Sequence, residues 1–215
     1  MFDYNNFISR KKKAVKRLED EIKIGRVDED IINLLRIINR FPLAYTTSSC
    51  SGRIQLIDIP EDMKKCNAKR IAIWHGEAPY QKIQKIVDTY TANGVLWMKT
   101  EPLIISIAVY DWKVASEFLA LARRVSLKNS GVRAISLGKA HIVVEFLGTE
   151  RMDIPLKHKK KVLVTPETLK FYVELANIRM RRVKEKIPRL EREFLELYRN
   201  YVETYQKLLQ PQDQI

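Results

Sequence analysis

The stretch "LAYTTSSCSGRIQLIDI", Leu43 to Ile59, places a run of small hydroxyl residues between two hydrophobic segments. The flanking segments "LAYTTS" and "GRIQLIDI" are short and rich in β-branched or aromatic residues, which predicts two strands. The hydroxyl run between them ends in Gly52 and Arg53. It is either a polar β-turn with Gly52 at a positive φ or a binding site, and composition alone leaves both open.

A binding role would rest on the donors that this run offers. Hydroxyls and backbone amides can hold an anion or a ribose, and the guanidinium of Arg53 presents a planar fork to a phosphate or carboxylate. The candidate residues for binding cofactor or substrate in this run are Ser48, Ser49, Cys50, Ser51, Gly52 and Arg53.

Outward from this stretch, hydrophobic periodicity predicts helices before and after a region of strands. A helix is expected over residues 3–23 and a second one through "IINLLRIINR". Strands then alternate with helices at 79–91 and 112–127, and "GVRAISLG" and "HIVVEFLG" indicate a hairpin joined near Gly138. A long helical segment starts at Pro166, with a kink or break expected at Pro188. In this last segment an apolar stripe should pack against the body of the protein; its residues are Leu190, Phe194, Leu197, Tyr201, Tyr205 and Leu208.

The order of these elements predicts the α+β class: a single domain over residues 1–215 with a mixed β-sheet. Residues 1–41 would form N-terminal helices, 42–165 the sheet core and 166–215 C-terminal helices. The strand order suggests two related β/α halves, and no Gly/Ser-rich linker separates them. No GxGxxG fingerprint follows the first strand, so the fold is not expected to be of the Rossmann type.

Composition and charge favour a polyanionic partner. The chain of 215 residues carries 39 Lys and Arg against 26 Asp and Glu, a formal net charge of +13. Such an excess favours nucleic acid, although a highly charged soluble surface would give the same count. Two cysteines without a CxxC pair and three scattered histidines make a disulfide framework or a structural zinc site unexpected. Without a signal peptide or a membrane span, we expect a cytoplasmic protein.

Two further motifs carry titratable groups between predicted strands. His75, in "WHG", can exchange a proton near neutral pH, and Trp74 could stack on a base; an ordinary strand end is the alternative. In "KTEP", Lys99 and Glu101 would share a face if the chain is extended there. Glu101 could then accept a proton in a cleft, or the two could form a surface ion pair of little energetic weight.

Basic residues cluster in three places: the first helix, "LKHKKK" at 156–161, and the run from Arg179 to Arg192. Each cluster alone is more often a solvated face, but three together favour contact with RNA phosphates. The predicted RNA-binding residues are Arg10, Lys11, Lys12, Lys13, Lys157, Lys159, Lys160, Arg181 and Arg182.

Several of these motifs occur in the order seen in one known family. "VDED", "TTSSCSGRI", a strand-end histidine, "KTEP", "NSG" and "IPLKHKKKVLVTPETLKFYVELAN" follow one another along the chain. The chain resembles the tRNA wybutosine-synthesising protein 3 family, including its archaeal members, over roughly residues 27–180. The chain departs from the family pattern in two places: Ser106 stands where a histidine is frequent, and residues 125–128 differ from the family's Ser-Gly-Phe-Arg.

The resemblance implies an S-adenosylmethionine-dependent methyltransferase with a fold that is not Rossmann-like. Its substrate would be N4 of a tricyclic guanosine derivative beside the anticodon of phenylalanine tRNA, and no metal is implied. By this resemblance Glu101 and His75 are the candidate catalytic groups, and Lys99, Asn129 and Ser130 join the hydroxyl run in binding. The competing interpretation is a tRNA- or RNA-binding protein without catalysis, which accounts for the charge equally well.

Overall fold

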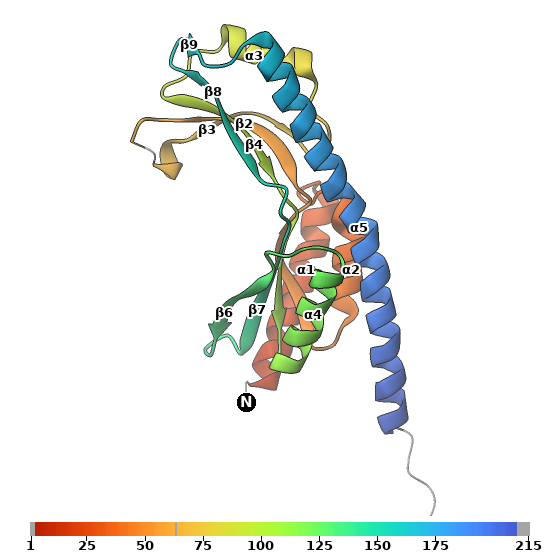
Figure 1. The fold of residues 1–215 in the computed structure, drawn as a ribbon. Coiled ribbons are helices and arrows are strands. Elements are labelled where there is room, and N and C mark those ends of the chain that lie inside the picture. Colours follow the sequence, from red (N-terminus) through yellow and green to blue (C-terminus); the bar gives the residue numbers. More distant parts are fainter. Residues whose placement is uncertain (1–2, 63, 210–215) are drawn as a thin grey trace, which may run out of the picture. The chain divides into compact units, whose positions relative to one another are not determined.

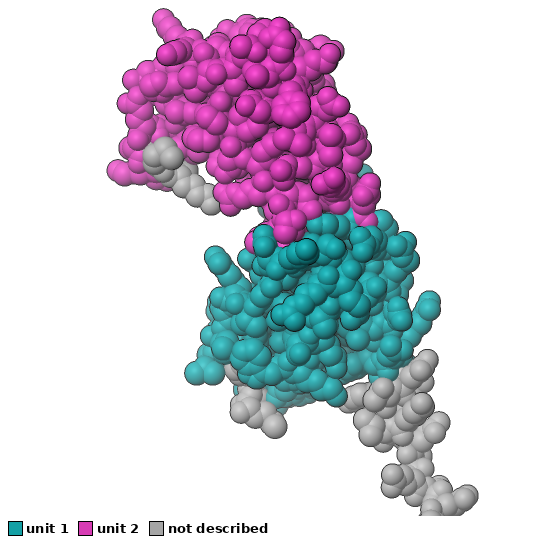
Figure 2. All heavy atoms as spheres, in the orientation of Figure 1, with its two compact units in different colours: residues 1–49, 105–146, 186–215 teal, residues 50–104, 147–185 magenta. Residues whose placement is uncertain are grey.

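The computed structural model describes residues 3–62 and 64–209, without the side chains of residue 65 and residues 203–209. Within them the chain forms two compact units. Unit 1 comprises residues 1–49, 105–146 and 186–215, and unit 2 comprises residues 50–104 and 147–185, the two colours of Figure 2. The chain therefore passes between the units at four points, which explains why no single flexible linker is visible in the sequence. The prediction of one domain over residues 1–215 stays a prediction.

Unit 1 is built on a four-stranded sheet with the strand order β1-β5-β7-β6. Its helices are α1, a 3-10 turn η1, α2, α4 and the second part of α5. The bounds are α1 Tyr4–Lys23, η1 Glu29–Ile31, α2 Ile32–Arg40, β1 Ala44–Cys50, β5 Ile104–Val109, α4 Trp112–Arg124, β6 Gly131–Ser136, β7 His141–Leu147 and α5 Pro166–Leu209. The helices and the β6–β7 hairpin that periodicity predicts are confirmed.

Aromatic rings fill the core of unit 1. Phe118 lies edge-on to Phe41 and to Phe194, with ring centroids 5.2 Å and 5.1 Å apart, and Phe146 stacks on Phe194 at 5.7 Å. All four rings are buried, together with Leu190. The predicted apolar stripe of α5 is thus confirmed at Leu190 and Phe194, whereas the side chains of Tyr205 and Leu208 lie outside the described residues.

Unit 2 is built on a five-stranded sheet with the strand order β3-β2-β4-β8-β9. A 3-10 turn η2, α3 and the first part of α5 complete it. The bounds are β2 Arg53–Ile59, η2 Lys65–Asn67, β3 Lys69–Trp74, α3 Tyr80–Thr89, β4 Val95–Glu101, β8 Met152–His158 and β9 Lys161–Val162. Every neighbouring pair of strands in this sheet is antiparallel. Figure 1 shows α3 and the first part of α5 together on one side of this sheet.

The α+β class without a Rossmann arrangement is confirmed, but the strands form two antiparallel sheets and not one mixed sheet. The difference arises within the stretch from Leu43 to Ile59. Only Ser51 and Gly52 separate β1 from β2, a length that would normally make a hairpin, yet the two strands belong to different sheets. The left-handed backbone of Gly52, with φ +89°, lies at this switch.

Of the kink or break expected at Pro188, the break does not occur, and the kink stays a prediction. Helix α5 runs from Pro166 to Leu209 with Pro188 inside it, and Figure 1 shows one continuous coil. A proline removes one backbone hydrogen bond and crowds the preceding turn. Pro188 itself is exposed, while Ile187 and Leu190 beside it are buried, so packing of the apolar face outweighs the local penalty.

Candidate functional site

The hydroxyl run is mostly extended chain and not a turn. Thr46 to Cys50 form the second half of β1, and Arg53 opens β2. Thr46 is buried, whereas Thr47, Ser48 and Ser49 are exposed. The run is also divided between the units: residues 46–49 belong to unit 1 and residues 50–53 to unit 2. It therefore contributes side chains to two sets of residues, which are described separately.

In unit 1 the run forms one wall of a cavity of about 430 Å³, named here the β1 cavity. The opposite walls come from α1 and from the loop that follows it. The lining residues are Lys13, Ala14, Arg17, Leu18, Glu21, Arg26, Val27, Asp28, Thr46, Thr47, Ser48 and Ser49. Its volume falls within the range of small-molecule sites.

The lining of the β1 cavity combines charges of both signs with apolar surface. Lys13, Arg17 and Arg26 provide cations, and Glu21 and Asp28 provide carboxylates. An ion pair joins Arg17 to Glu21 at 2.8 Å. Hydroxyls line the β1 side, and three aliphatic side chains add apolar surface. Such a lining suits a small zwitterion that carries a carboxylate, a cation and an apolar ring.

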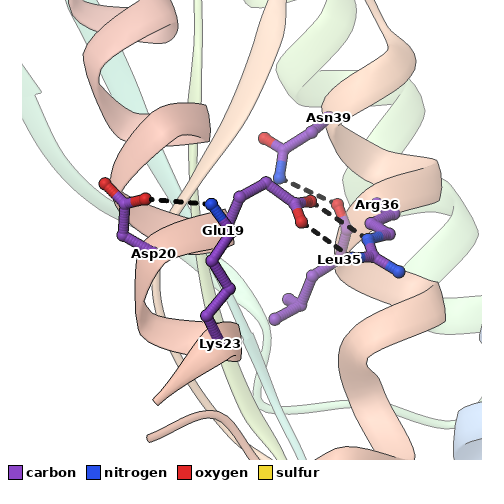
Figure 3. Close-up of polar contacts among 6 residues, drawn as sticks. All are labelled: Glu19, Asp20, Lys23, Leu35, Arg36 and Asn39. Atoms are coloured by element: carbon purple, nitrogen blue, oxygen red, sulfur yellow. Dashed lines mark hydrogen bonds and ion pairs between the residues drawn. The ribbon is translucent and has the colours of Figure 1, made fainter. Parts of the chain in front are cut away.

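Hydrogen bonds hold the β1 wall in place. The Asn39 side chain, at the end of α2, accepts from the Thr46 backbone N–H at 2.9 Å and donates to the Thr46 hydroxyl at 2.9 Å. The same amide also donates to the Leu35 carbonyl, as Figure 3 shows. The hydroxyl of the next residue, Thr47, donates to the carbonyl of Ser106 in β5. Thr46 and Thr47 of the hydroxyl wall are therefore held in place without a ligand.

The helix that forms the other wall is tied to α2 as well. Both oxygens of Glu19 in α1 accept from Arg36 in α2, at 3.0 Å and 2.7 Å, and this fork is drawn in Figure 3. The hydrogen bonds from Arg36 hold the pKa of Glu19 below its usual value. Both side chains are exposed enough for solvent to screen the pair, so its main effect is to orient α1.

In unit 2, strand register brings the predicted charged residues onto one face of the sheet. Arg53 lies opposite Glu101, and Lys99 lies opposite Gln55 and Asp153. Arg53 Nε lies 2.5 Å from Glu101 Oε2, and Lys99 Nζ lies 3.3 Å from Asp153 Oδ2. The expectation that Lys99 and Glu101 share a face is confirmed, because β4 extends through "KTE" to Glu101.

The link between the strands is buried in unit 2. Ser51 is fully buried, and Lys184 of α5 donates to its hydroxyl at 2.7 Å and to its carbonyl at 3.1 Å. A Cβ on Gly52 would lie 2.8 Å from Val183 Cγ1, so any larger residue there would force its neighbours to shift. Ser51 and Gly52 thus fix the position of Arg53, the first residue of β2, and both are buried.

The remaining predicted site residues do not line the β1 cavity. His75 is exposed just after β3, and Cys50 is half-buried at the end of β1. Asn129 and Ser130 belong to the loop between α4 and β6 of unit 1 and do not line the β1 cavity. The structure thus groups Ser48 and Ser49 in unit 1 and Arg53, Lys99 and Glu101 in unit 2. His75 directly follows Trp74, which pairs with Ile54 next to Arg53.

Two of the predicted RNA contacts need correction. Lys157 is only 4% exposed and donates to the Val87 carbonyl at 2.7 Å, beneath α3. Lys11 donates to the carbonyls of Asn39, Phe41 and Ala44, and burial lowers its pKa to about 8. Both lysines therefore serve the fold and not RNA. The sequence around these two lysines does not indicate such contacts, because a long side chain can bury its aliphatic part and reach a distant carbonyl.

The other predicted RNA contacts are accessible or line the cavity. Arg10 is half-buried, and the exposed residues of the set are Lys12, Lys13, Lys159, Lys160, Arg181 and Arg182. Lys159 and Arg181 form ion pairs with Glu61 and Glu77, at 2.9 Å and 2.7 Å. Lys13 lines the β1 cavity, a place that its sequence context did not indicate.

The charged residues that sequence reasoning missed in these sets include Arg17, Glu21, Arg26, Asp28 and Lys184. Among them, Asp28 has a sequence feature that points to the site, because it stands in the "VDED" motif that carries the family resemblance. Asp28 stands at the N-cap position of η1, yet its side chain makes no capping hydrogen bond there. It lines the β1 cavity instead.

Metal and membrane features are not found in the described part of the chain. Residues 3–62 and 64–209 contain no group of three His, Cys, Asp or Glu side chains arranged to hold a metal ion. None of their helices is both long and apolar enough to span a bilayer.

Comparison with known proteins identifies the family. The family model described as "Methyltransferase TYW3" matches residues 9–196. A Thermococcus sibiricus protein named tRNA(Phe) 7-((3-amino-3-carboxypropyl)-4-demethylwyosine(37)-N(4))-methyltransferase is 40% identical over 200 residues, 92% of this chain and 99% of that protein. A Pyrococcus horikoshii protein of the same name, numbered 1, is 38% identical over 86% of this chain and 93% of its own.

Solved structures agree with the sequence comparison. The PH1069 protein from Pyrococcus horikoshii superimposes with a TM-score of 0.83 at 37% identity, covering 89% of this chain and 97% of that one. A hypothetical protein from Aeropyrum pernix gives a TM-score of 0.67 at 27% identity, over 79% of this chain and 98% of its own. The family match extends over most of the chain, and the hydroxyl run lies inside it. The chain therefore belongs to the Methyltransferase TYW3 family.

Proposed function

We propose that this protein transfers a methyl group from S-adenosylmethionine to N4 of a 4-demethylwyosine-type base beside the anticodon of phenylalanine tRNA. The observation that carries the proposal is the β1 cavity, whose hydroxyl wall is formed by the same run that carries the family resemblance. The names of the archaeal relatives support the substrate, and the net charge of +13 supports an RNA partner. We also propose that the protein acts in the cytoplasm on the anticodon arm.

The lining of the β1 cavity fits the donor group by group. Lys13 and Arg17 would hold its carboxylate, and Asp28 or Glu21 would hold its ammonium or the ribose hydroxyls, to which Ser48 and Ser49 would also donate. Leu18 and the other aliphatic side chains would cover the adenine. When bound, S-adenosylmethionine supplies an electrophilic methyl on a positively charged sulfur.

The residues of unit 2 would act on the base. N4 loses its proton as the new N–C bond forms, so a proton acceptor close to N4 speeds the reaction. We propose Glu101 for this role, with Arg53 holding its carboxylate in one orientation at 2.5 Å. His75 is the second candidate. Lys99 would bind a phosphate or the carboxylate of the substrate's side chain. Transfer is direct, and Cys50 is not proposed as a nucleophile.

Binding of the donor is tested by thermal shift. A ligand bound only by the folded state stabilises it by about 2.7 kcal/mol at 100 times its Kd. S-adenosylmethionine should raise the melting temperature of the wild type and of Arg40→Ala, an exposed residue of α2 outside the cavity. The shift should be lost in Arg17→Ala. Equal shifts in Arg17→Ala and Arg40→Ala would place the donor outside the β1 cavity.

The reaction itself is tested by methyl transfer. Phenylalanine tRNA from cells that lack this protein is incubated with the protein and radiolabelled S-adenosylmethionine, then digested for nucleoside mass spectrometry. A labelled tricyclic nucleoside heavier by one methyl, reduced in Ser49→Ala and in Glu101→Ala, supports the reaction and both sets of residues. Tight tRNA binding without any label would instead favour a non-catalytic RNA-binding protein.

A further inference from the structure

The two faces of the five-stranded sheet in unit 2 differ in how they are covered. Side chains that point to one face are buried; they include Ile54, Leu56, Leu96, Met98 and Thr100, each 0% exposed. Figure 1 shows α3 and the first part of α5 together on one side of this sheet. The other face, named here the open face, is formed by Arg70, Ile73, Arg53, Gln55, Ile57, Trp97, Lys99, Glu101, Asp153 and Pro155. Apart from Gln55, all of these are half-buried or exposed.

Register and one irregularity determine which cations reach the open face. Gln55 pairs with Ile73, but the register of β3 shifts after Leu56, so that Arg70 lies opposite Ile57. The side chain of Arg70 accordingly donates from Nε to Gln55 Oε1 at 3.2 Å. The shift thus adds an exposed arginine to the same face as Arg53 and Lys99.

The open face combines positive charge with an aromatic ring. Arg53, Arg70 and Lys99 provide three cations, against the two carboxylates of Glu101 and Asp153. Arg151, directly before β8, adds a fourth cation through its ion pair with Asp153. At its centre, Lys99 Nζ lies 5.7 Å from the ring centroid of Trp97. Ile57 and Pro155 flank Trp97 on the neighbouring strands. Cations that surround a partly exposed indole are the arrangement with which proteins hold single-stranded nucleic acid, through phosphate contacts and base stacking.

We infer that the open face binds the single-stranded nucleotides of the substrate's anticodon loop. One base stacks on Trp97, and Arg70 binds the backbone phosphates. This inference rests on the proposed function for the identity of the RNA. It differs from the prediction that the basic clusters of α1 and of residues 156–161 carry the RNA contact. A protein partner on the same face would be expected to bind a more apolar and less basic surface.

The first test measures affinity for a fluorescently labelled anticodon stem-loop RNA. Stacking on an aromatic ring contributes enough that Trp97→Ala should weaken binding about 10- to 100-fold, whereas Trp97→Phe should stay close to the wild type. Arg70→Ala should weaken binding and reduce the slope of log affinity against log salt by about 1. The matched control is Trp112→Ala, a 59% exposed tryptophan of α4 in unit 1, which should bind as the wild type does.

The second test does not depend on truncating Trp97. In the Trp74→Phe/Trp112→Phe protein, Trp97 is the one remaining tryptophan of the three in the chain. A stacked base should quench its fluorescence when the loop RNA is added, and a stem duplex without the loop should not. Unquenched fluorescence at saturating RNA, or equal affinity of Trp97→Ala and wild type, would overturn the inference.

The outcomes separate the inference from the proposed function. Methylation by the wild type together with unchanged affinity in Trp97→Ala and Arg70→Ala refutes the open face but leaves the reaction standing. Loop binding that requires Trp97, without methyl transfer under any condition, supports the open face and refutes the reaction. A wild-type protein that binds no anticodon RNA refutes both.

Discussion

The Lys184 ammonium of α5 lies 2.7 Å from the hydroxyl and 3.1 Å from the carbonyl of Ser51, the buried residue at which the chain leaves β1. Gly52 follows directly, and Arg53 then begins β2. One lysine thus holds the point from which the charged row of Arg53 and Glu101 starts. The chemistry proposed for Arg53 and Glu101 therefore depends on the contact between Lys184 and Ser51. These two residues are far apart in the sequence, and neither is a reacting group.

Replacement of Lys184 should therefore destabilise unit 2 without removing a reacting group. Lys184→Met deprives the buried Ser51 of its charged donor, and the loss of a hydrogen bond to a charged group costs about 1.5–3 kcal/mol. Urea denaturation should show this decrease in the free energy of unfolding. The matched control, Lys170→Met, changes an exposed lysine of the same helix and should be nearly neutral. Equal stability of the two variants would contradict a structural role for Lys184.

Gly52 should not tolerate alanine, for two separable reasons. Its φ of +89° is strained for a residue with a Cβ, and that Cβ would lie 2.8 Å from Val183 Cγ1. We expect Gly52→Ala to lose about 1–3 kcal/mol of stability. Gly25→Ala is the control: Gly25 also has a positive φ, +67°, but a Cβ there meets nothing within 4 Å. The excess loss at Gly52 over Gly25, measured by thermal denaturation, then reports the close packing alone.

Alkaline pH should weaken unit 2 through Tyr90. Its hydroxyl donates to the buried carboxylate of Asp58 at 2.9 Å, and burial together with this hydrogen bond raises the pKa of Tyr90 to about 12. An unfolded tyrosine titrates near pH 10, so the stabilisation from the neutral hydroxyl is complete below about pH 10 and is lost as pH rises toward 12. Tyr90→Phe lacks this hydroxyl. The stability difference between wild type and Tyr90→Phe, measured at pH 8 and pH 11.5, should shrink at the higher pH; a constant difference would exclude the linkage.

Local patterns in the sequence predicted the elements but not their assembly. Periodicity located α1, α4 and the β6–β7 hairpin, because these depend on residues close together in the chain. The division into two sheets depends on how two residues, Ser51 and Gly52, connect β1 to β2, and a two-residue link more often makes a hairpin. Pro188 does not break α5, since burial of Ile187 and Leu190 outweighs a local penalty.

The candidate sites were predictable to the extent that they lie on regular strands. Lys99 and Glu101 share a face because β4 is extended, as the spacing indicated. The contribution of α1 to the β1 cavity was hidden, since Lys13 and Arg17 look like ordinary members of a solvated basic face. The sequence predicts RNA contacts for Lys11 and Lys157 because no local pattern shows which backbone carbonyls a long side chain will reach.

The pairing of Arg53 with Glu101 should be visible in catalysis more than in stability. Both side chains are partly exposed, 25% and 35%, so the ion pair itself contributes at most about 1 kcal/mol to folding. If Arg53 orients the carboxylate that accepts the N4 proton, each single alanine variant should lower the rate of methyl transfer. The double variant should then be no slower than the slower single one, since residues that act as a unit are non-additive. Arg124 and Glu193 form a comparable pair in unit 1 at 2.6 Å, and their alanine variants should leave methyl transfer unchanged. Losses that multiply in the Arg53/Glu101 double variant would mean that the two side chains act independently, and Glu101 would then need another partner to orient it.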